Sequence, residues 1–359
     1  MRRIAIFVFI LFFLGTTVFI VLHFWQKEEI SFYEANDERI HYVGRFDFSD
    51  KDSPKAWAPG TYLEFESEGT SCEIVVEDEV KFGNTHNYLE IVLDHGKTKR
   101  IRLGSRINRI QLYKDAKGGK HHVLVCKNTE SAIGFIKIKG IYCQKLCKWK
   151  KPRKRLFEFI GDSITCGNGA DQSSIPFGKG SWYDYHNAYL SYGARLARER
   201  NADWVLSSVS GIGMNKSCCG LKNTMPKVYE HIDFHTEHKK WSFVKKPDVV
   251  FITLGQNDGG NEMMNYERKY KEFLIDLRRK YPKSWIICCS SPMASLDLKQ
   301  KMKKSIQKVI RWYQQKGDNR IASFHYEGIY CSGYDKHPTV EQHRFMMHEL
   351  KSFLDAHNI

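Results

Sequence analysis

The spacing of apolar residues changes near residue 150, and this change divides the chain into two parts. Before it, short runs alternate apolar and polar residues, as in residues 88–93 (YLEIVL). After it, strand-like apolar runs alternate with longer runs of helical spacing. A period of two residues is typical of half-buried strands, whereas strand–helix alternation is typical of a parallel sheet covered by helices on both faces. The sequence therefore predicts an α/β fold preceded by a β-rich part.

The first part reads as a β-sandwich. Seven or eight short strands are predicted there, separated by clusters of Gly, Asn and Asp and spaced roughly 8–15 residues apart. The segment from Cys147 to Arg155 is basic and contains Pro152, which favours a join between domains. We therefore divide the chain into an N-terminal segment (1–29), a β-sandwich domain (30–147) and an α/β domain (148–359).

The α/β domain is predicted to hold a five-stranded parallel sheet in a three-layer α/β/α arrangement. Five apolar runs have the length of strands: 156–160, 204–209, 249–254, 285–289 and 321–326. Four longer runs have helical spacing: 183–200, 264–281, 296–315 and 339–358. Right-handed crossovers bring the carboxyl ends of the strands to one edge, where such folds hold their functional side chains.

The N-terminal segment has the length of a membrane span. Residues 4–25 are almost continuously apolar, and His23 is their only ionisable residue. At about 1.5 Å per residue, a helix of this length crosses the hydrocarbon core. Arg2 and Arg3 precede the run, so we expect the N-terminus in the cytosol and the rest outside or in a lumen. We favour a retained single-pass anchor; a cleaved signal peptide, which would make the protein secreted, is the alternative.

Charge and cysteine content narrow the classes of partner and cofactor. The formal net charge is +15, which suits acidic partners or simply a lysine-rich surface. No zinc-finger spacing and no aromatic–basic RNA motif is present in the sequence, so we do not predict nucleic-acid binding. Ten cysteines fit an exported chain in which some pair. No zinc-ligand spacing stands out either, so we predict no metal and no other cofactor.

A Gly-Asp-Ser turn follows the first strand of the α/β domain. Ser163 in this turn lies at the carboxyl end of that strand, after Gly161 and Asp162. Glycine lets the backbone turn tightly and leaves the hydroxyl accessible. A serine becomes a nucleophile at neutral pH only with a neighbouring base. Ser163 is thus a candidate nucleophile, and a serine that caps the next helix is the alternative.

Four further residues belong with Ser163 at this edge. His337 lies in a loop before the last helix and is the candidate base. Asp335 is a candidate for orienting the imidazole, or else a turn former. Asn257 and Gly211 follow other strands, and an amide group at such a position can stabilise a developing oxyanion. Together they predict a serine hydrolase.

These residues resemble the signature blocks of SGNH (GDSL-type) hydrolases. Gly161-Asp162-Ser163, then Gly211, then Gly255-x-Asn257-Asp258 and then His337-Pro338 occur in the family's order. Residues 39–45 and 57–61 resemble the jelly-roll module that precedes this domain in carbohydrate esterase family 2. The resemblance implies a membrane-anchored or secreted serine esterase that removes O-acetyl groups from carbohydrates.

The resemblance also implies a role for each matching residue. Ser163 would be the nucleophile and His337 the general base. The Ser163 and Gly211 amides and the Asn257 side chain would form the oxyanion hole. The family commonly has Asp-x-x-His, but that position is Tyr334 here, and Asp335 forms Asp-x-His instead. Either the Asp335 carboxylate or a backbone carbonyl would therefore orient His337.

The substrate is less constrained than the chemistry. Trp182 and Tyr185 lie where aromatic faces could stack on sugar rings, although packing of the adjacent helix is the alternative. An acetylated glycan or another small ester is the expected substrate. Two other readings keep the same fold: an esterase or acyltransferase for lipid or other acyl groups, and a glycan-binding protein with an inactive site.

Overall fold

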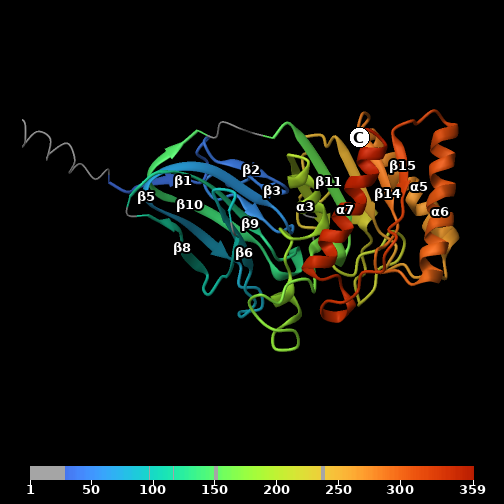
Figure 1. Cartoon of the computed structure of the whole chain (residues 1–359), viewed down its shortest axis with the longest axis horizontal. Helices are drawn as coiled ribbons and strands as arrows, with labels where there is room; N and C mark the ends of the chain where they lie inside the picture. Colours follow the sequence, from blue (N-terminus) through green and yellow to red (C-terminus); the bar gives the residue numbers. More distant parts are fainter. Residues whose placement is uncertain (1–28, 97, 116, 149–152, 236–238) are drawn as a thin grey trace, which may run out of the picture.

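The computed structural model describes residues 29–96, 98–115, 117–148, 153–235 and 239–359 (Figure 1). The predicted anchor over residues 1–29 lies outside these ranges apart from its last residue. Within them, no helix is both long and apolar enough to cross a membrane. All ten cysteines are described, and each is a free thiol.

Ten antiparallel strands form the N-terminal domain and belong to one hydrogen-bonded sheet. They are β1 (Ser31–Glu34), β2 (His41–Val43), β3 (Phe46–Asp47), β4 (Lys55–Ala56), β5 (Tyr62–Asp78), β6 (Tyr88–Leu93), β7 (Thr98–Arg102), β8 (Ile107–Lys114), β9 (Lys120–Lys127) and β10 (Ile136–Cys147). The long strand β5 changes partner along its length: residues 62–68 pair with β9 and residues 71–77 pair with β8. Strand β10 runs along its other edge.

Alternation of side chains along β5 explains how this domain forms a core. Cys72, Ile74 and Val76 are completely buried, whereas the glutamates between and after them, Glu73 and Glu77, are only partly buried. Because successive strand residues point to opposite faces, the apolar set of every strand can gather on the inside. The structure confirms the predicted β domain, which has ten antiparallel strands where the sequence predicted seven or eight.

The C-terminal domain contains the predicted five-stranded parallel sheet, in the order β12-β11-β13-β14-β15. Its strands are β11 (Arg155–Gly161), β12 (Ala202–Ser208), β13 (Val249–Thr253), β14 (Trp285–Cys289) and β15 (Ile321–Phe324). Its α-helices are α2 (Ser163–Cys166), α3 (Tyr192–Glu199), α4 (Met225–Val228), α5 (Met263–Lys280), α6 (Leu296–Gln315) and α7 (Val340–Ala356). The α/β fold class is therefore confirmed.

Both faces of this sheet are buried, which gives the three predicted layers. Phe159 and Phe251 stack in the cluster under α3 and α7, while their neighbours Ile160 and Ile252 belong to the cluster under α5 and α6. A strand buried on both faces needs apolar side chains in both directions, so its sequence is a continuous apolar run. Figure 1 shows β14 and β15 between α7 and the α5–α6 pair.

The predicted helix over residues 183–200 is only partly formed. The chain instead makes a short 3₁₀ turn, η2 (Trp182–Tyr185), and starts α3 only at Tyr192. Between them, the Asn187 N–H donates to the Gly167 carbonyl at 3.0 Å. The Asn187 side-chain oxygen accepts from the Leu190 N–H at 2.9 Å. These local side-chain and loop hydrogen bonds compete with the helical ones and delay the helix.

The two domains are joined by buried polar and aromatic contacts. Arg45 of the β domain is 0% exposed, and its guanidinium donates to the Tyr229 carbonyl at 2.7 Å and the Ser207 hydroxyl at 3.0 Å. Tyr62 stacks on Trp204 with ring centroids 4.0 Å apart. An arginine is buried only where its donors are met, so these contacts fix one relative placement of the domains.

Candidate active site

A cavity of about 600 Å³ lies where the loops after β11, β12 and β13 meet the loop before α7. Ser163, Gly211, Asn257, Asp335 and His337 all line it. The topology therefore brings together all five side chains or amides that the sequence placed at this edge.

The turn after β11 is built to present Ser163. The Asp162 side chain accepts from the Ile164 N–H at 3.0 Å and so caps α2, whose first residue is Ser163. Gly161 has to be glycine, because a Cβ there would lie 2.0 Å from the Thr165 hydroxyl oxygen. Ser163 is thus not the capping residue, and its hydroxyl is free to face the cavity.

Ser163 and His337 are in direct contact. The His337 Nε2 lies 2.8 Å from the Ser163 Oγ, and its Nδ1 lies 3.0 Å from the backbone carbonyl oxygen of Asp335. The carbonyl can only accept, so Nδ1 carries the hydrogen and Nε2 is left with a lone pair toward the serine. This is the geometry that a general base needs.

The Asp335 carboxylate does not have the orienting position expected for it. The hydrogen bond to His337 comes from the Asp335 main chain, in a short turn, η3 (Tyr334–Lys336), where Asp335 has φ 50° and Lys336 has φ 57°. A left-handed backbone is uncommon for residues other than glycine. Here the left-handed backbone bends the turn back, and this brings the Asp335 carbonyl oxygen to the imidazole of the residue two positions later.

A glycine on the facing loop makes room for this turn. The Tyr334 N–H donates to the Gly169 carbonyl at 2.9 Å. Gly169 has φ +66°, and a Cβ there would lie 2.4 Å from the Tyr334 carbonyl and 2.8 Å from the His337 Cβ. The second glycine of the Gly-Asn-Gly sequence is thus explained by close approach to the histidine loop.

Burial tunes the titration of the histidine. Burial lowers the pKa of His337, and the hydrogen bond with the Asp335 carbonyl partly opposes that shift. Desolvation disfavours the charged imidazolium, so the neutral form extends to lower pH than for an exposed histidine. The imidazole is therefore unprotonated, as a base must be, at neutral pH.

Three hydrogen-bond donors lie beside the serine. Among the residues that the structure describes, neither the Ser163 nor the Gly211 N–H has an acceptor. The Asn257 Nδ2 donates to the Ile212 carbonyl at 2.9 Å and lies 3.4 Å from an Asp162 oxygen. The first contact fixes the amide, while the second is long and weak. Donors fixed before a reaction begins are what an oxyanion hole requires.

Two further groups hold these donors in place: Cys218, which no motif indicates, and Asp258, which belongs to the signature block of Asn257 but was given no role. The Cys218 Sγ lies 3.3 Å from the Asn257 Oδ1 and donates to it. Burial raises the pKa of Cys218 to about 12, so the thiol keeps its hydrogen. Asp258 accepts from the Met214 and Lys216 N–H groups at 2.9 and 3.0 Å and so ties down the loop after Gly211.

The β domain also contributes to the cavity. Glu130 and Ala132 line it, and the Glu130 side chain accepts from the Ser210 N–H at 2.6 Å. The residue next to Gly211 is therefore positioned from the other domain. No motif around Glu130 indicates this, because its partner lies 80 residues away in the chain.

The two aromatic candidates behave differently. Trp182 lines the cavity and is 38% exposed, so its ring is available to a ligand. Tyr185 does not line it: the side chain is completely buried, and its hydroxyl binds the Lys179 and Gly180 N–H groups and the Pro176 carbonyl. The expected substrate contact of Tyr185 is therefore wrong. Its ring packs against Tyr334, with centroids 4.4 Å apart, and supports the turn that precedes His337.

A serine bonded to a buried histidine, beside fixed amide donors at the edge of a parallel sheet, defines a serine-dependent acyl hydrolase. Comparison with known proteins agrees. Residues 157–350 match the model of the GDSL-like lipase/acylhydrolase family, and residues 42–152 match the carbohydrate esterase 2 N-terminal domain. The first match covers more than half of the chain, which thus belongs to the GDSL-like lipase/acylhydrolase family.

The similarity to individual known proteins extends over both domains. The chain is 29% identical over 336 residues to the cellulase/esterase CelE of Acetivibrio thermocellus, covering 88% of this chain and 39% of that longer protein. It is 25% identical over 329 residues to an acetylxylan esterase/glucomannan deacetylase of Cellvibrio japonicus, covering 88% of each chain. A family two carbohydrate esterase from Clostridium thermocellum, solved in complex with cellohexaose, superposes with a TM-score of 0.80 at 27% identity, covering 88% of this chain and 98% of that one.

Proposed function

We propose that this protein is a serine esterase that removes O-acetyl groups from carbohydrates. The observation that carries the proposal is the 2.8 Å contact between Ser163 and a buried, correctly oriented His337. Relatives that span both domains are named for deacetylation of xylan and glucomannan, which supports an acetylated glycan as the substrate class.

In the first half of the reaction, the Ser163 oxygen forms a bond to the acetyl carbonyl carbon and its proton passes to the His337 Nε2. The carbonyl oxygen becomes an oxyanion that accepts from the Ser163 and Gly211 amides and the Asn257 side chain. When the intermediate collapses, the bond between carbon and sugar oxygen breaks. His337 donates the proton to the departing sugar oxygen, which leaves as a hydroxyl, and the acetyl group stays on Ser163.

In the second half, His337 takes a proton from water as the water oxygen bonds to the acetyl carbon. Collapse of this second intermediate breaks the bond to Ser163, and the proton returns to the serine oxygen. Acetate leaves, and the starting state is restored. Every proton moves through Nε2, because the Asp335 carbonyl holds the other hydrogen on Nδ1.

The cavity supports a small acyl group on a larger alcohol. Loops after three strands line it beside Ser163, and the partly exposed Trp182 also lines it, where a sugar face can stack on the ring. An acetyl group would enter beside the nucleophile while the glycan lies along the open side. A long acyl chain would need a deep apolar tunnel instead.

Acetate release from acetylated xylan and glucomannan oligosaccharides tests the proposal, alongside a p-nitrophenyl ester series from acetate to octanoate. We expect the protein to release acetate from the glycans and to hydrolyse the acetate ester faster than the octanoate ester. Both activities should fall at least a thousandfold in Ser163→Ala. Ser174→Ala, an exposed serine of the same domain that does not line the cavity, is the matched control and should keep its activity. A preference for octanoate would favour a lipid esterase, and glycan binding without turnover would favour a binding protein.

We further propose that the enzyme works outside the cytosol, attached to a membrane by the apolar run of residues 4–25. The run has the length of a span, and two arginines precede it. Alkaline carbonate extraction of membranes from producing cells tests this. Protein that stays in the pellet supports the anchor, and protein released with its N-terminus removed would show a cleaved signal peptide.

A further inference from the structure

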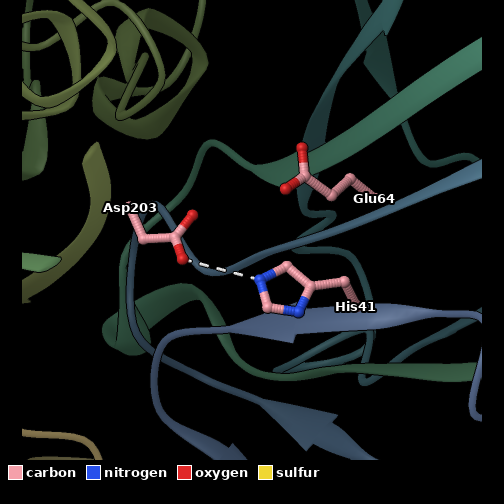
Figure 2. A group of neighbouring side chains, drawn as sticks. All are labelled: His41, Glu64 and Asp203. Atoms are coloured by element: carbon pink, nitrogen blue, oxygen red, sulfur yellow. Dashed lines mark ion pairs between the residues drawn. The ribbon is translucent and has the colours of Figure 1, made fainter. Parts of the chain in front are cut away.

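Three side chains of the kinds that bind metals meet between the two domains. His41 on β2, Glu64 on β5 and Asp203 on β12 each offer one atom to a group in which all these atoms lie within 4.8 Å of one another (Figure 2). Asp203 is the second residue of its strand, whereas Ser163 follows the carboxyl end of the neighbouring strand. The group is therefore at the opposite end of the parallel sheet from the catalytic cavity.

In each carboxylate, one oxygen accepts hydrogen bonds from neighbouring side chains and the other faces the group. The Glu64 Oε1 accepts from the Arg153 guanidinium at 2.7 Å. The Asp203 Oδ1 accepts from the same guanidinium at 3.2 Å and from the Tyr62 hydroxyl at 2.6 Å. Hydrogen bonds of this kind to the outer oxygen orient the carboxylate ligands in metal sites.

The other two oxygens face imidazoles. Glu64 is 0% exposed, and its Oε2 receives no hydrogen bond within the described part of the chain. It lies 3.3 Å from the His122 Nε2. The Asp203 Oδ2 lies 3.5 Å from the His41 Nε2, which is itself buried and without a hydrogen bond. Figure 2 shows the Glu64 carboxylate and the His41 ring directed toward Asp203.

The formal charges around the group do not cancel, and a cation would balance them. Two carboxylates carry two negative charges, and Arg153 supplies one positive charge. With neutral imidazoles one negative charge remains, in a position where burial makes an uncompensated charge costly. A buried carboxylate oxygen that accepts no hydrogen bond, next to excess negative charge, is an arrangement that a bound cation would satisfy.

We propose that the His41 Nε2, the Glu64 Oε2 and the Asp203 Oδ2 bind a divalent transition metal, with zinc as the best match. Nitrogen together with carboxylate oxygen suits zinc better than magnesium or calcium, which take oxygen ligands. Zinc bonds to such ligands are about 2.0–2.2 Å long, so the side chains close in slightly around the ion. The His41 side chain is 21% exposed, which gives the ion a path of entry.

A metal here would link the domains. Two ligands come from the β domain and one from the first residues of β12 in the α/β domain. None of the three is near another in sequence, so no spacing motif could have indicated the site. A proton on His41 is the competing explanation, because an imidazolium would balance the same charge.

Zinc binding to the full-length protein tests the proposal. Protein stripped with EDTA is titrated calorimetrically with Zn²⁺, its melting temperature is followed with and without zinc, and Co²⁺ is used as a visible-absorbing probe. We expect one zinc per chain, a melting temperature that rises with zinc, and cobalt bands typical of a four-coordinate nitrogen–oxygen site. His41→Gln should weaken zinc binding at least tenfold.

The matched control is His86→Gln. His86 is another histidine of the β domain paired with a buried carboxylate, Asp78, at 3.0 Å, but it lies outside the group. This variant should bind zinc like the wild type. The proposal is overturned if the wild type takes up no zinc, if His41→Gln binds it equally well, or if zinc leaves the melting temperature unchanged. The last result would mean that a proton balances the charge.

Discussion

At the scale of single residues, the orientation of His337 depends on a main-chain oxygen. The Asp335 carbonyl, 3.0 Å from Nδ1, needs no particular side chain at that position, only a backbone in the left-handed region. Asparagine tolerates that region as well as aspartate does. The structure therefore places a serine–histidine pair in the cavity, and the main chain orients its histidine.

Asp335→Asn tests this directly. We expect kcat for p-nitrophenyl acetate to change by less than about fivefold, because the carbonyl contact survives. In triads whose carboxylate orients the histidine, the same change costs about 10⁴ in kcat. A loss of a hundredfold or more would show that the carboxylate acts on His337 after all.

The lowered pKa of His337 predicts the acid side of the pH profile. The neutral imidazole is the active base, so activity is present above the His337 pKa and is lost as the pH falls through it. Because burial moves that pKa down, the midpoint of kcat/KM should lie below the usual histidine value of about 6.5. A midpoint above 7 would contradict the described environment.

At the scale of residues, a site could be predicted from the sequence only where the residue type itself indicates the chemistry. Ser163, His337, Gly211 and Asn257 stood out because their chemistry and their positions at strand ends agree, and the structure brings them together. The sequence does not distinguish whether the carboxylate or the main-chain carbonyl of Asp335 orients His337, since every residue has a carbonyl. The Cys218 contact with Asn257 had no signal at all, because it depends on how one loop folds back.

At the scale of elements, the spacing of apolar residues predicts helices and strands correctly where burial alone determines the secondary structure. Residues 296–315 form α6 and residues 285–289 form β14 with the predicted bounds. It failed over residues 183–200, where Asn187 makes loop hydrogen bonds in place of helical ones. In this segment, which leads from the cavity residue Trp182 to α3, polar contacts override this spacing.

Gly169 tests how closely the loops must approach. Gly169→Ala adds a Cβ 2.4 Å from the Tyr334 carbonyl, so the His337 loop has to shift and kcat should fall at least tenfold. Gly259→Ala is the matched control, since it has the same φ of +66° with nothing within 4 Å of the added atom. Both variants should lose about 1–2 kcal/mol to backbone strain. Equal activity in the two would contradict the proposed close approach.

At the scale of the whole molecule, the β domain is part of the active site and not an appendage. Glu130 positions the Ser210 N–H, and Arg45 reaches into the α/β domain next to Glu158. The sequence predicted both domains but not how they dock. Arg45 and Glu130 read as ordinary charged residues, and their partners lie 80 to 186 residues away.

Arg45→Ala should be among the most destabilising single changes. It removes buried hydrogen bonds to Tyr229, His231 and Ser207 and leaves Glu158, which is 1% exposed, without its cation. Breaking a buried ion pair in this way costs about 3–5 kcal/mol. Arg39→Ala, in a pair with Asp37 nearer the surface, should cost less than about 1 kcal/mol. Thermal unfolding of both variants measures the difference, and similar melting temperatures would contradict the docking described here.

In the proposed reaction, Ser163 carries the acetyl group between the sugar and water. Intact-protein mass spectrometry after rapid acid quenching of a reaction with excess p-nitrophenyl acetate tests it most directly, with peptide mapping of the product. We predict a mass increase of one acetyl group, mapped to Ser163 and missing in Ser163→Ala. An acetyl group on another residue, or equal ester turnover by the wild type and Ser163→Ala, would contradict the account.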